Sequence, residues 1–161
     1  DMLSEGGTGI AIIPVSCVIS PNKAKHEILA KHTLKAVMSM PSDLFYPVGT
    51  VTCIVIFEAN RPHAATNNKT WFGYWRDDGF TKTKQFGRID INHTWENIKE
   101  SWVEQFRNNE VHPGESVTAY VTADDEWIAE AYLETDYSEL TKEDFETSVK
   151  NYAMFKLLNK V

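Results

Sequence analysis

The chain has 161 residues and a formal net charge of −7, and 42% of its residues are hydrophobic. This size and composition suit one folded domain with a real core, and no apolar run is long enough to span a membrane. Residues 122–161 carry 4 basic and 10 acidic side chains, whereas residues 1–121 carry 12 and 13. A general polyanion-binding protein shows the opposite bias, so any nucleic-acid contact must come from a local patch or from other parts of the protein.

The first residues are typical of the end of a helix. Residues 2–5 would form a last helical turn, and Gly6 and Gly7 would stop it in the left-handed conformation. Residues 9–15 follow at once as a continuous apolar run, which is typical of a strand buried on both faces. We therefore expect the natural polypeptide to begin upstream of residue 1, and part of its chemistry to lie there.

The next predicted elements are a helix and two strands. The helix covers residues 23–31, with Ser20 as its expected N-cap and Pro21 at its start. A strand over residues 34–40 completes a strand–helix–strand unit, so it runs parallel to the first strand in the same sheet. Residues 50–58 are rich in β-branched side chains and follow without an intervening helix, which predicts an antiparallel strand.

The loop between these last two strands contains two adjacent aromatic residues. Residues 41–49 include two prolines and a glycine, yet also Phe45 and Tyr46, which a hydrophobic core does not obviously require there. Enzymes that modify a base swing it out of the stack and hold it against aromatic faces. Phe45 and Tyr46 are therefore candidates for binding a target base. The alternative is a hydrophobic plug that closes the end of the sheet.

Residues 61–161 are expected to form an α+β or helical extension packed on residues 1–60. Residues 80–92 are mostly polar and are expected to be irregular. The other predicted elements are a strand over residues 70–75 that ends at the Asp77-Asp78-Gly79 turn, a helix capped by Thr94 that ends near Asn108, a short strand over residues 116–121, a short helix or ordered loop over residues 124–132, and a final helix that starts at Thr141 with Asp144 in a capping box.

Four stretches, which together cover most of the chain, resemble the modification (M) subunit of type I restriction-modification systems, an adenine-specific DNA methyltransferase. These stretches are GGTGIAIIPVSCVIS, LKAVMSMPSDLFYPVGTVTCIVIFEA, WFGYWRDDGFTKTKQFGRID and EWIAEAYLETDYSELTKEDF. The resemblance is to the back half of that subunit. It implies an α/β fold in which residues 9–15, 34–40 and 50–58 are the last three strands of a Rossmann-like methyltransferase sheet, two parallel strands and one antiparallel strand, followed by a helical extension.

The resemblance also implies a function for the whole protein. Such an enzyme moves a methyl group from S-adenosylmethionine to the exocyclic amine of adenine in DNA, in the cytoplasm, together with specificity and restriction subunits. The family's acidic, glycine-rich donor loop and its Asn/Asp-Pro-Pro-aromatic tetrapeptide do not occur here. Gly6-Gly7-Thr8-Gly9 precedes a strand instead of joining a strand to a helix, so it is no substitute. We expect these residues alone to be inactive, with no catalytic residue, cofactor or metal.

Lys82, Lys84 and Arg88 are the candidate DNA contacts. They lie in a locally basic stretch over residues 69–88 that is interleaved with aromatic residues, as in a contact to the DNA backbone. The neighbouring Asp77 and Asp78 favour the alternative, a solvated face with aromatic anchors. Asp124, Asp125, Glu126 and Glu130 suggest a metal site only by composition, and a solvated acidic surface, which could also bind a basic patch on another subunit, is the preferred interpretation.

A second function class is a non-catalytic interaction module of a DNA-modifying complex. The acidic C-terminal region or an exposed sheet edge would then serve assembly. If earlier strands of the sheet are absent, the edge formed by residues 9–15 is bare, and bare apolar edges pair with other chains, so we expect self-association.

Cys17 and Cys53 lie in or beside apolar strands, which suits buried free thiols in a reducing cytoplasm, with a disulfide as the alternative.

Overall fold

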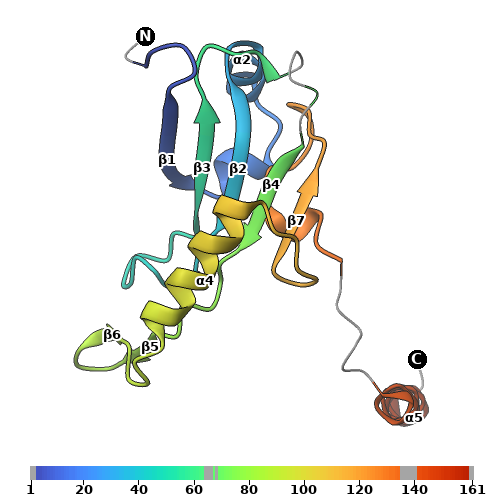
Figure 1. Cartoon of the computed structure of the whole chain (residues 1–161). Helices are drawn as coiled ribbons and strands as arrows, with labels where there is room; N and C mark the ends of the chain where they lie inside the picture. The colour runs from blue at the N-terminus through green and yellow to red at the C-terminus, as the bar shows by residue number, and fades with distance from the viewer. Residues whose placement is uncertain (1–2, 64–66, 68, 135–140, 160–161) are drawn as a thin grey trace.

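A computed structural model describes residues 3–63, 67, 69–134 and 141–159. Five strands form one sheet in the order β1-β3-β2-β4-β7 (Figure 1), and a hairpin of two short strands lies at one end of it. Only the β2–β4 pair is parallel, whereas the other three pairs are antiparallel. The strands are β1 (Thr8–Pro14), β2 (Thr33–Ser39), β3 (Thr52–Glu58), β4 (Thr70–Tyr74), β7 (Ser116–Ala119), and the hairpin strands β5 (Thr81–Thr83) and β6 (Gly87–Ile89).

The predicted strand directions are confirmed for the first three strands. Both β1 and β2 pair antiparallel with β3, which lies between them, so β1 and β2 run in the same direction. The loop of residues 41–49 connects β2 to β3 without a helix, which allows the reversal. The fold is therefore mixed α/β with a mostly antiparallel sheet, and its assignment as part of a Rossmann-like sheet stays a prediction.

Helices cover both faces of the sheet. On one face lie α1 (Ser16–Ile19), α2 (Lys23–Lys31) and the 3-10 helix η1 (Ala129–Ala131), and on the other lies α4 (Trp95–Asn108) (Figure 1). The first face buries mainly aliphatic side chains, together with Phe72 and Trp127. The second buries the indoles of Trp71 and Trp75 under Trp102 and Phe106 of α4.

Strand β1 differs from the expected strand buried on both faces. Ile10 is 67% exposed and Ile12 is 59% exposed. Their cross-strand partners, Ile56 and Ile54, belong to the core under α4, but β1 is the edge strand of the sheet and the helix packs over its centre. The prediction that this strand is buried on both faces is therefore wrong for Ile10 and Ile12. An apolar run in the sequence does not say which element, if any, covers the strand.

Three helix starts differ from the sequence expectation. A short helix, α1, lies between β1 and α2, where the sequence predicts no element, and Asn22 rather than Ser20 caps α2 by accepting a hydrogen bond from Lys25 N. The side chain of Thr94 makes no cap bond at α4. Instead the carboxylate of Asp90 accepts from the amides of Thr94 and Trp95, at 2.9 and 3.0 Å. An acceptor four residues upstream can therefore replace the N-cap side chain.

Other expectations divide between confirmed and corrected. The capping box of α5 (Lys142–Asn159) is present, since Thr141 N donates to Asp144 Oδ2 at 3.0 Å and Asp144 N to Thr141 Oγ1 at 3.2 Å. Residues 80–92 are not irregular, because they contain the β5–β6 hairpin. Of the helical turn expected at residues 2–5, residue 2 lies outside the described residues and residues 3–5 are not helical, whereas Gly6 has the expected left-handed φ of 71°.

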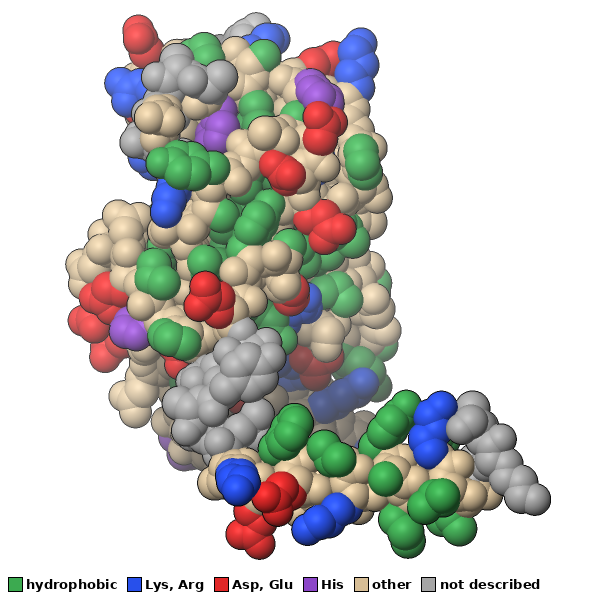
Figure 2. Space-filling model, turned by 90° about the vertical axis from the view of Figure 1, so that its right-hand side faces the viewer, with side chains coloured by type: hydrophobic (Ala, Val, Ile, Leu, Met, Phe, Trp, Pro, Cys, Tyr) green, Lys and Arg blue, Asp and Glu red, His purple; other side chains and the backbone are tan. Residues whose placement is uncertain are grey.

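The apolar side chains of α5 are exposed, with Phe145 at 69% and Leu158 at 77% (Figure 2). No helix among the described residues has the length and apolarity that crossing a bilayer requires.

Both cysteines are free, and Cys53 is buried, which raises the pKa of its thiol to about 12. Cys17 is exposed, so the expectation of two buried thiols is wrong for this residue, which lies on the short helix α1.

Candidate functional site at the carboxyl edge of β2 and β4

The parallel strands β2 and β4 end at the same edge of the sheet. The loop of residues 41–49 leaves β2 there, and residues 75–80 leave β4 toward the β5–β6 hairpin (Figure 1). In open α/β sheets, ligands bind outside the carboxyl ends of parallel strands. This edge is therefore where the described residues offer a candidate site.

Arg88 of β6 forms an ion cluster at this edge. Its Nη2 donates to Asp78 Oδ1 at 2.7 Å, and its Nε lies 3.0 Å from Asp43 Oδ1 in the loop of residues 41–49. The side chain of Arg88 is 11% exposed and that of Asp78 is 8% exposed. Burial alone would lower the pKa of Arg88, but the hydrogen bond and charge of Asp78, with the charge of Asp43, raise it above its usual value.

The two aromatic residues of the loop lie beside this cluster. Phe45 is 45% exposed and Tyr46 is 47% exposed. Tyr46 N donates to Asp43 O at 3.0 Å, so the turn that carries the aromatic pair starts at the residue that meets Arg88. Lys82 Nζ lies 4.0 Å from the centroid of the Tyr46 ring, which is a close cation–π contact.

A cavity of about 410 Å³ opens between the loop, the hairpin and α4. Its wall is rich in aromatic rings: Phe80 packs against Trp95 at 5.8 Å and Trp95 against Trp102 at 5.9 Å between ring centroids. The Arg88–Asp78 pair contributes the charged part of the wall. The lining residues are Met40, Leu44, Tyr46, Asp78, Phe80, Gly87, Arg88, Trp95 and Trp102.

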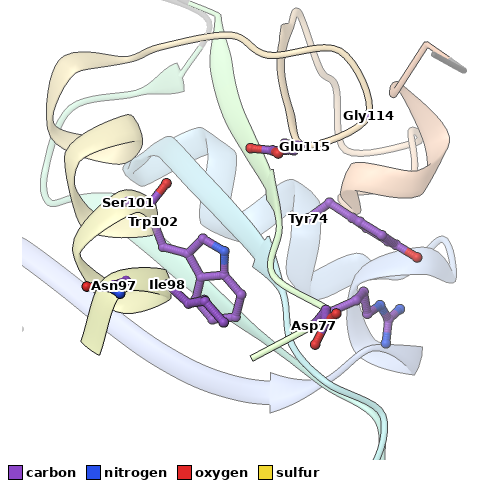
Figure 3. A pocket seen from close by; sticks show the side chains of 9 residues that line it. Tyr74, Asp77, Asn97, Ile98, Ser101, Trp102, Gly114 and Glu115 are labelled. Carbon is purple, nitrogen blue, oxygen red and sulfur yellow. The ribbon is translucent and has the colours of Figure 1, made fainter. Parts of the chain in front are cut away.

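A second cavity, of about 500 Å³, lies next to the first, and Trp102 lines both. Figure 3 shows Trp102 extending from α4, with Tyr74 and Asp77 across the opening and Glu115 above it. Arg76, which also lines this cavity, donates from Nη1 to Met40 O and from Nε to Glu130 Oε1, each at 2.9 Å. Arg76 thereby ties the end of β4 to the end of β2 and to η1.

The structure brings some predicted site residues together and separates others. Phe45, Tyr46 and Lys82 lie at one edge, and Lys84 is exposed on the turn of the hairpin. Arg88 has a different environment, since two carboxylates face its guanidinium. Sequence reasoning missed the contributions of Asp43 and Asp78 and the aromatic wall formed by Phe80, Trp95 and Trp102. The stretch DDGF…GRID was a usable signal for Asp78 and Arg88, but nothing local in the sequence pointed to Asp43.

Three of the acidic residues near η1 already pair with other side chains of the chain. Asp124 Oδ1 lies 3.2 Å from His26 Nε2, and Glu130 pairs with Arg76. The carboxylate of Asp125 accepts from the backbone amide and the hydroxyl of Thr122, which lowers its pKa. Within the described ranges, no group of three or more His, Cys, Asp or Glu side chains is placed to hold a metal ion.

Comparison with known proteins defines the class. The family model described as N-6 DNA Methylase matches residues 1–159, so the chain belongs to that family. It is 30% identical over 161 residues to the "Type II restriction enzyme and methyltransferase RM.BcgI" of Heyndrickxia coagulans. That match covers 97% of this chain and 25% of the relative, so the chain spans about a quarter of the length of this curated protein.

Solved structures show the same fold. The type I restriction-modification methyltransferase subunit from Streptococcus thermophilus matches with a TM-score of 0.59 and 16% identity, over 80% of this chain and 27% of that one. A modification subunit of a putative type I restriction enzyme from Vibrio vulnificus YJ016 matches with a TM-score of 0.53 and 12% identity, over 84% and 29%. The resemblance to adenine-specific modification subunits is therefore confirmed.

Proposed function

We propose that this chain is the C-terminal part of an S-adenosylmethionine-dependent, adenine-specific DNA methyltransferase of a restriction-modification system. The family match over nearly the whole chain supports the class, and the quarter-length coverage of the relative supports a part rather than the whole. Residues 1–60 would complete the catalytic domain, with β1, β2 and β3 as its last strands, and residues 61–161 would be the extension. The two free cysteines favour a cytoplasmic location.

The donor would be bound by other parts of the protein. In the resembling family an acidic, glycine-rich loop that joins a strand to a helix binds the donor, whereas the glycine-rich start of this chain precedes β1. The amides of the glycine-rich start are already used, since Gly6 N donates to Ala59 O and Gly7 N donates to Ser4 O, each at 3.0 Å. These residues do not fit S-adenosylmethionine, and we assign no step of methyl transfer to them.

The role proposed for this chain is to hold the target base. The observation that carries it is the pair of half-exposed aromatic rings, Phe45 and Tyr46, at the carboxyl edge beside an aromatic-walled cavity. Stacking on such a ring contributes about 1–3 kcal/mol per base. Lys82 and Lys84 are exposed on the adjacent hairpin, where they would meet phosphates of the flanking DNA.

The test is Tyr46→Ala in the full-length methyltransferase. Loss of one stacking partner should lower methylation about 10- to 100-fold, with little change in melting temperature because the ring is half exposed. Tyr120→Ala is the matched control, since Tyr120 is 63% exposed and also carries a lysine, Lys69, over its ring. Parallel losses of melting temperature and activity would support the hydrophobic plug instead.

An assembly role is the second candidate, and the β1 edge favours it. Ile10 and Ile12 are exposed on a strand whose outer edge has no paired strand among the described residues. The partners would be a second copy of this chain or the other subunits of a restriction-modification complex. Light scattering tests self-association: Ile12→Lys should shift oligomers toward monomer, and a monomeric parent chain at high concentration would contradict this role.

A further inference from the structure

We propose that Arg88 is a positioning residue: it bridges the β5–β6 hairpin to the loop of residues 41–49 and so fixes where Tyr46 is presented. The geometry that carries this is the placement of one guanidinium between two carboxylates from different segments, Asp43 of the loop and Asp78 of the turn before β5. The consequence for catalysis rests on the proposed function, whereas the bridging is a property of this chain.

The bridge is built into the site rather than lying on the surface. Arg88 and Asp78 are nearly buried, and Asp43 is 36% exposed at its side chain. The guanidinium also lies over the ring of Phe80, at 5.4 Å from its centroid, which fixes the plane of the side chain. Nη2 of Arg88 donates to Asp78 and Nε lies in an ion pair with Asp43, so the single ammonium group of a lysine cannot reproduce the arrangement.

The loop is held at two points by the same hairpin. Arg88 on β6 meets Asp43, and Lys82 on β5 lies over the Tyr46 ring. The backbone bond from Tyr46 N to Asp43 O connects these two contacts, so displacing Asp43 displaces the start of the turn that carries Tyr46. Removing Arg88 would leave the carboxylates of Asp43 and Asp78 near each other without a counter-charge, and their repulsion would push the loop away from the hairpin.

This environment separates Arg88 from Lys82 and Lys84. A phosphate at Arg88 would compete with the carboxylates of Asp78 and Asp43 for a guanidinium whose side chain is 11% exposed, whereas the two lysines are exposed. We therefore assign Arg88 to positioning, in place of the DNA contact expected from the sequence. The prediction is that losing Arg88 changes the order of the loop and the rate of methyl transfer, but not the strength of DNA binding.

The experiment compares Arg88→Ala, Arg88→Lys and the control Arg61→Ala in the full-length protein. Arg61 pairs with Glu58 at the far end of the sheet and is 59% exposed. Hydrogen exchange should become about tenfold faster at the amides of Tyr46 and Val48 in Arg88→Ala, less so in Arg88→Lys, and remain unchanged in Arg61→Ala. Methylation should show a lower kcat with an unchanged Kd for DNA and an unchanged salt dependence.

The outcomes separate this proposal from the proposed function. Unchanged hydrogen exchange in the loop of Arg88→Ala would overturn the positioning role. The role would also be overturned if Arg88→Ala bound DNA more weakly and the salt dependence of its Kd fell by about one phosphate contact. A full-length protein without methyltransferase activity would refute the proposed function, while the exchange result would still decide the bridge. If Arg88→Ala does not fold, Asp43→Ala breaks the bridge from the loop side, keeps the buried Arg88–Asp78 pair and should accelerate the same amides.

Discussion

The face of the sheet under α1, α2 and η1 differs from the face under α4 in how its polar groups are satisfied. On the first face the amine of Lys25 is buried, and it donates to Val18 O at 3.1 Å and Asp125 O at 2.5 Å while lying over the Trp127 ring. Desolvation lowers the pKa of this amine, although the nearby acidic residues oppose the shift. The contacts of Lys25 join α1, α2 and the segment before η1, all of which pack on this face, so this lysine has a structural role.

The face under α4 is aromatic and continues into the site. Trp71 Nε1 donates to Glu110 O at 2.8 Å, and Trp75 stacks on Trp102 at 5.1 Å with an interplanar angle of 2°. Trp102 is half-buried because it lines both cavities at the carboxyl edge. The layer of α1, α2 and η1 therefore stabilises the sheet, whereas the layer of α4 also forms the wall of the candidate site.

The largest expected effect is the loss of stability from Trp127→Ala. The ring is 1% exposed and its Nε1 donates to Thr122 O at 2.8 Å, so the substitution leaves a large cavity and an unpaired carbonyl. The free energy of unfolding should fall by about 3–5 kcal/mol, measured by urea denaturation. Hydrogen exchange in the loop of residues 41–49, compared under native conditions, should not change.

The matched substitution on the other face is Trp102→Ala. The ring is only half-buried, so the free energy of unfolding should fall by about 2 kcal/mol, less than for Trp127→Ala. Exchange in the loop of residues 41–49 should nevertheless accelerate, because Trp102 lines the cavity beside Tyr46. The distinction between the two faces would be lost if Trp127→Ala disturbed that loop as much as Trp102→Ala did.

A medium effect is expected at Gly79, in the turn that positions Asp78. Its φ is 76°, and a Cβ there would lie 2.2 Å from Thr94 Oγ1 at the start of α4. Gly79→Ala should lower the free energy of unfolding by about 2 kcal/mol, from backbone strain and from the contact together. Gly87→Ala is the control, since Gly87 has a φ of 70° but no atom within 4 Å of the added Cβ. Equal losses at both glycines would show that the contact with α4 contributes nothing.

Much of the sheet could be predicted from the sequence because its signals are local. The β-branched run at β3 and the helical spacing of apolar residues in α4 each lie within one segment, and the missing crossover helix gave the strand direction. The β5–β6 hairpin escaped prediction because its two strands have three residues each and few apolar side chains. Strands that short carry no detectable alternation.

The site was predictable only where adjacent residues carry the signal. Phe45 and Tyr46 stand out as neighbouring aromatic residues in a loop, so the sequence offers them as candidates, and their binding of a base stays a prediction. The bridge from Asp43 to Arg88 joins segments far apart in the sequence, and a charge gives no sign of its partner at that separation. The basic character of Arg88 predicted a DNA contact, and its place between two carboxylates supports the positioning role that we propose instead.

The smallest effect concerns Asp90, which caps α4 beside the site. The hydrogen bond from Trp95 N, followed by that from Thr94 N, holds the pKa of this carboxyl below its usual value. A lowered pKa in the folded state means that the stabilisation is complete above the unfolded value of about 3.9 and is lost as the pH falls through the folded value. Melting temperatures of wild type and Asp90→Ala should therefore differ at pH 7 and converge below about pH 4.

Asp90→Asn keeps an acceptor for the α4 amides without a titrating charge, so its melting temperature should change less with pH than that of the wild type. A gap between wild type and Asp90→Ala that stays constant into strong acid would show that the carboxylate charge contributes nothing to the cap.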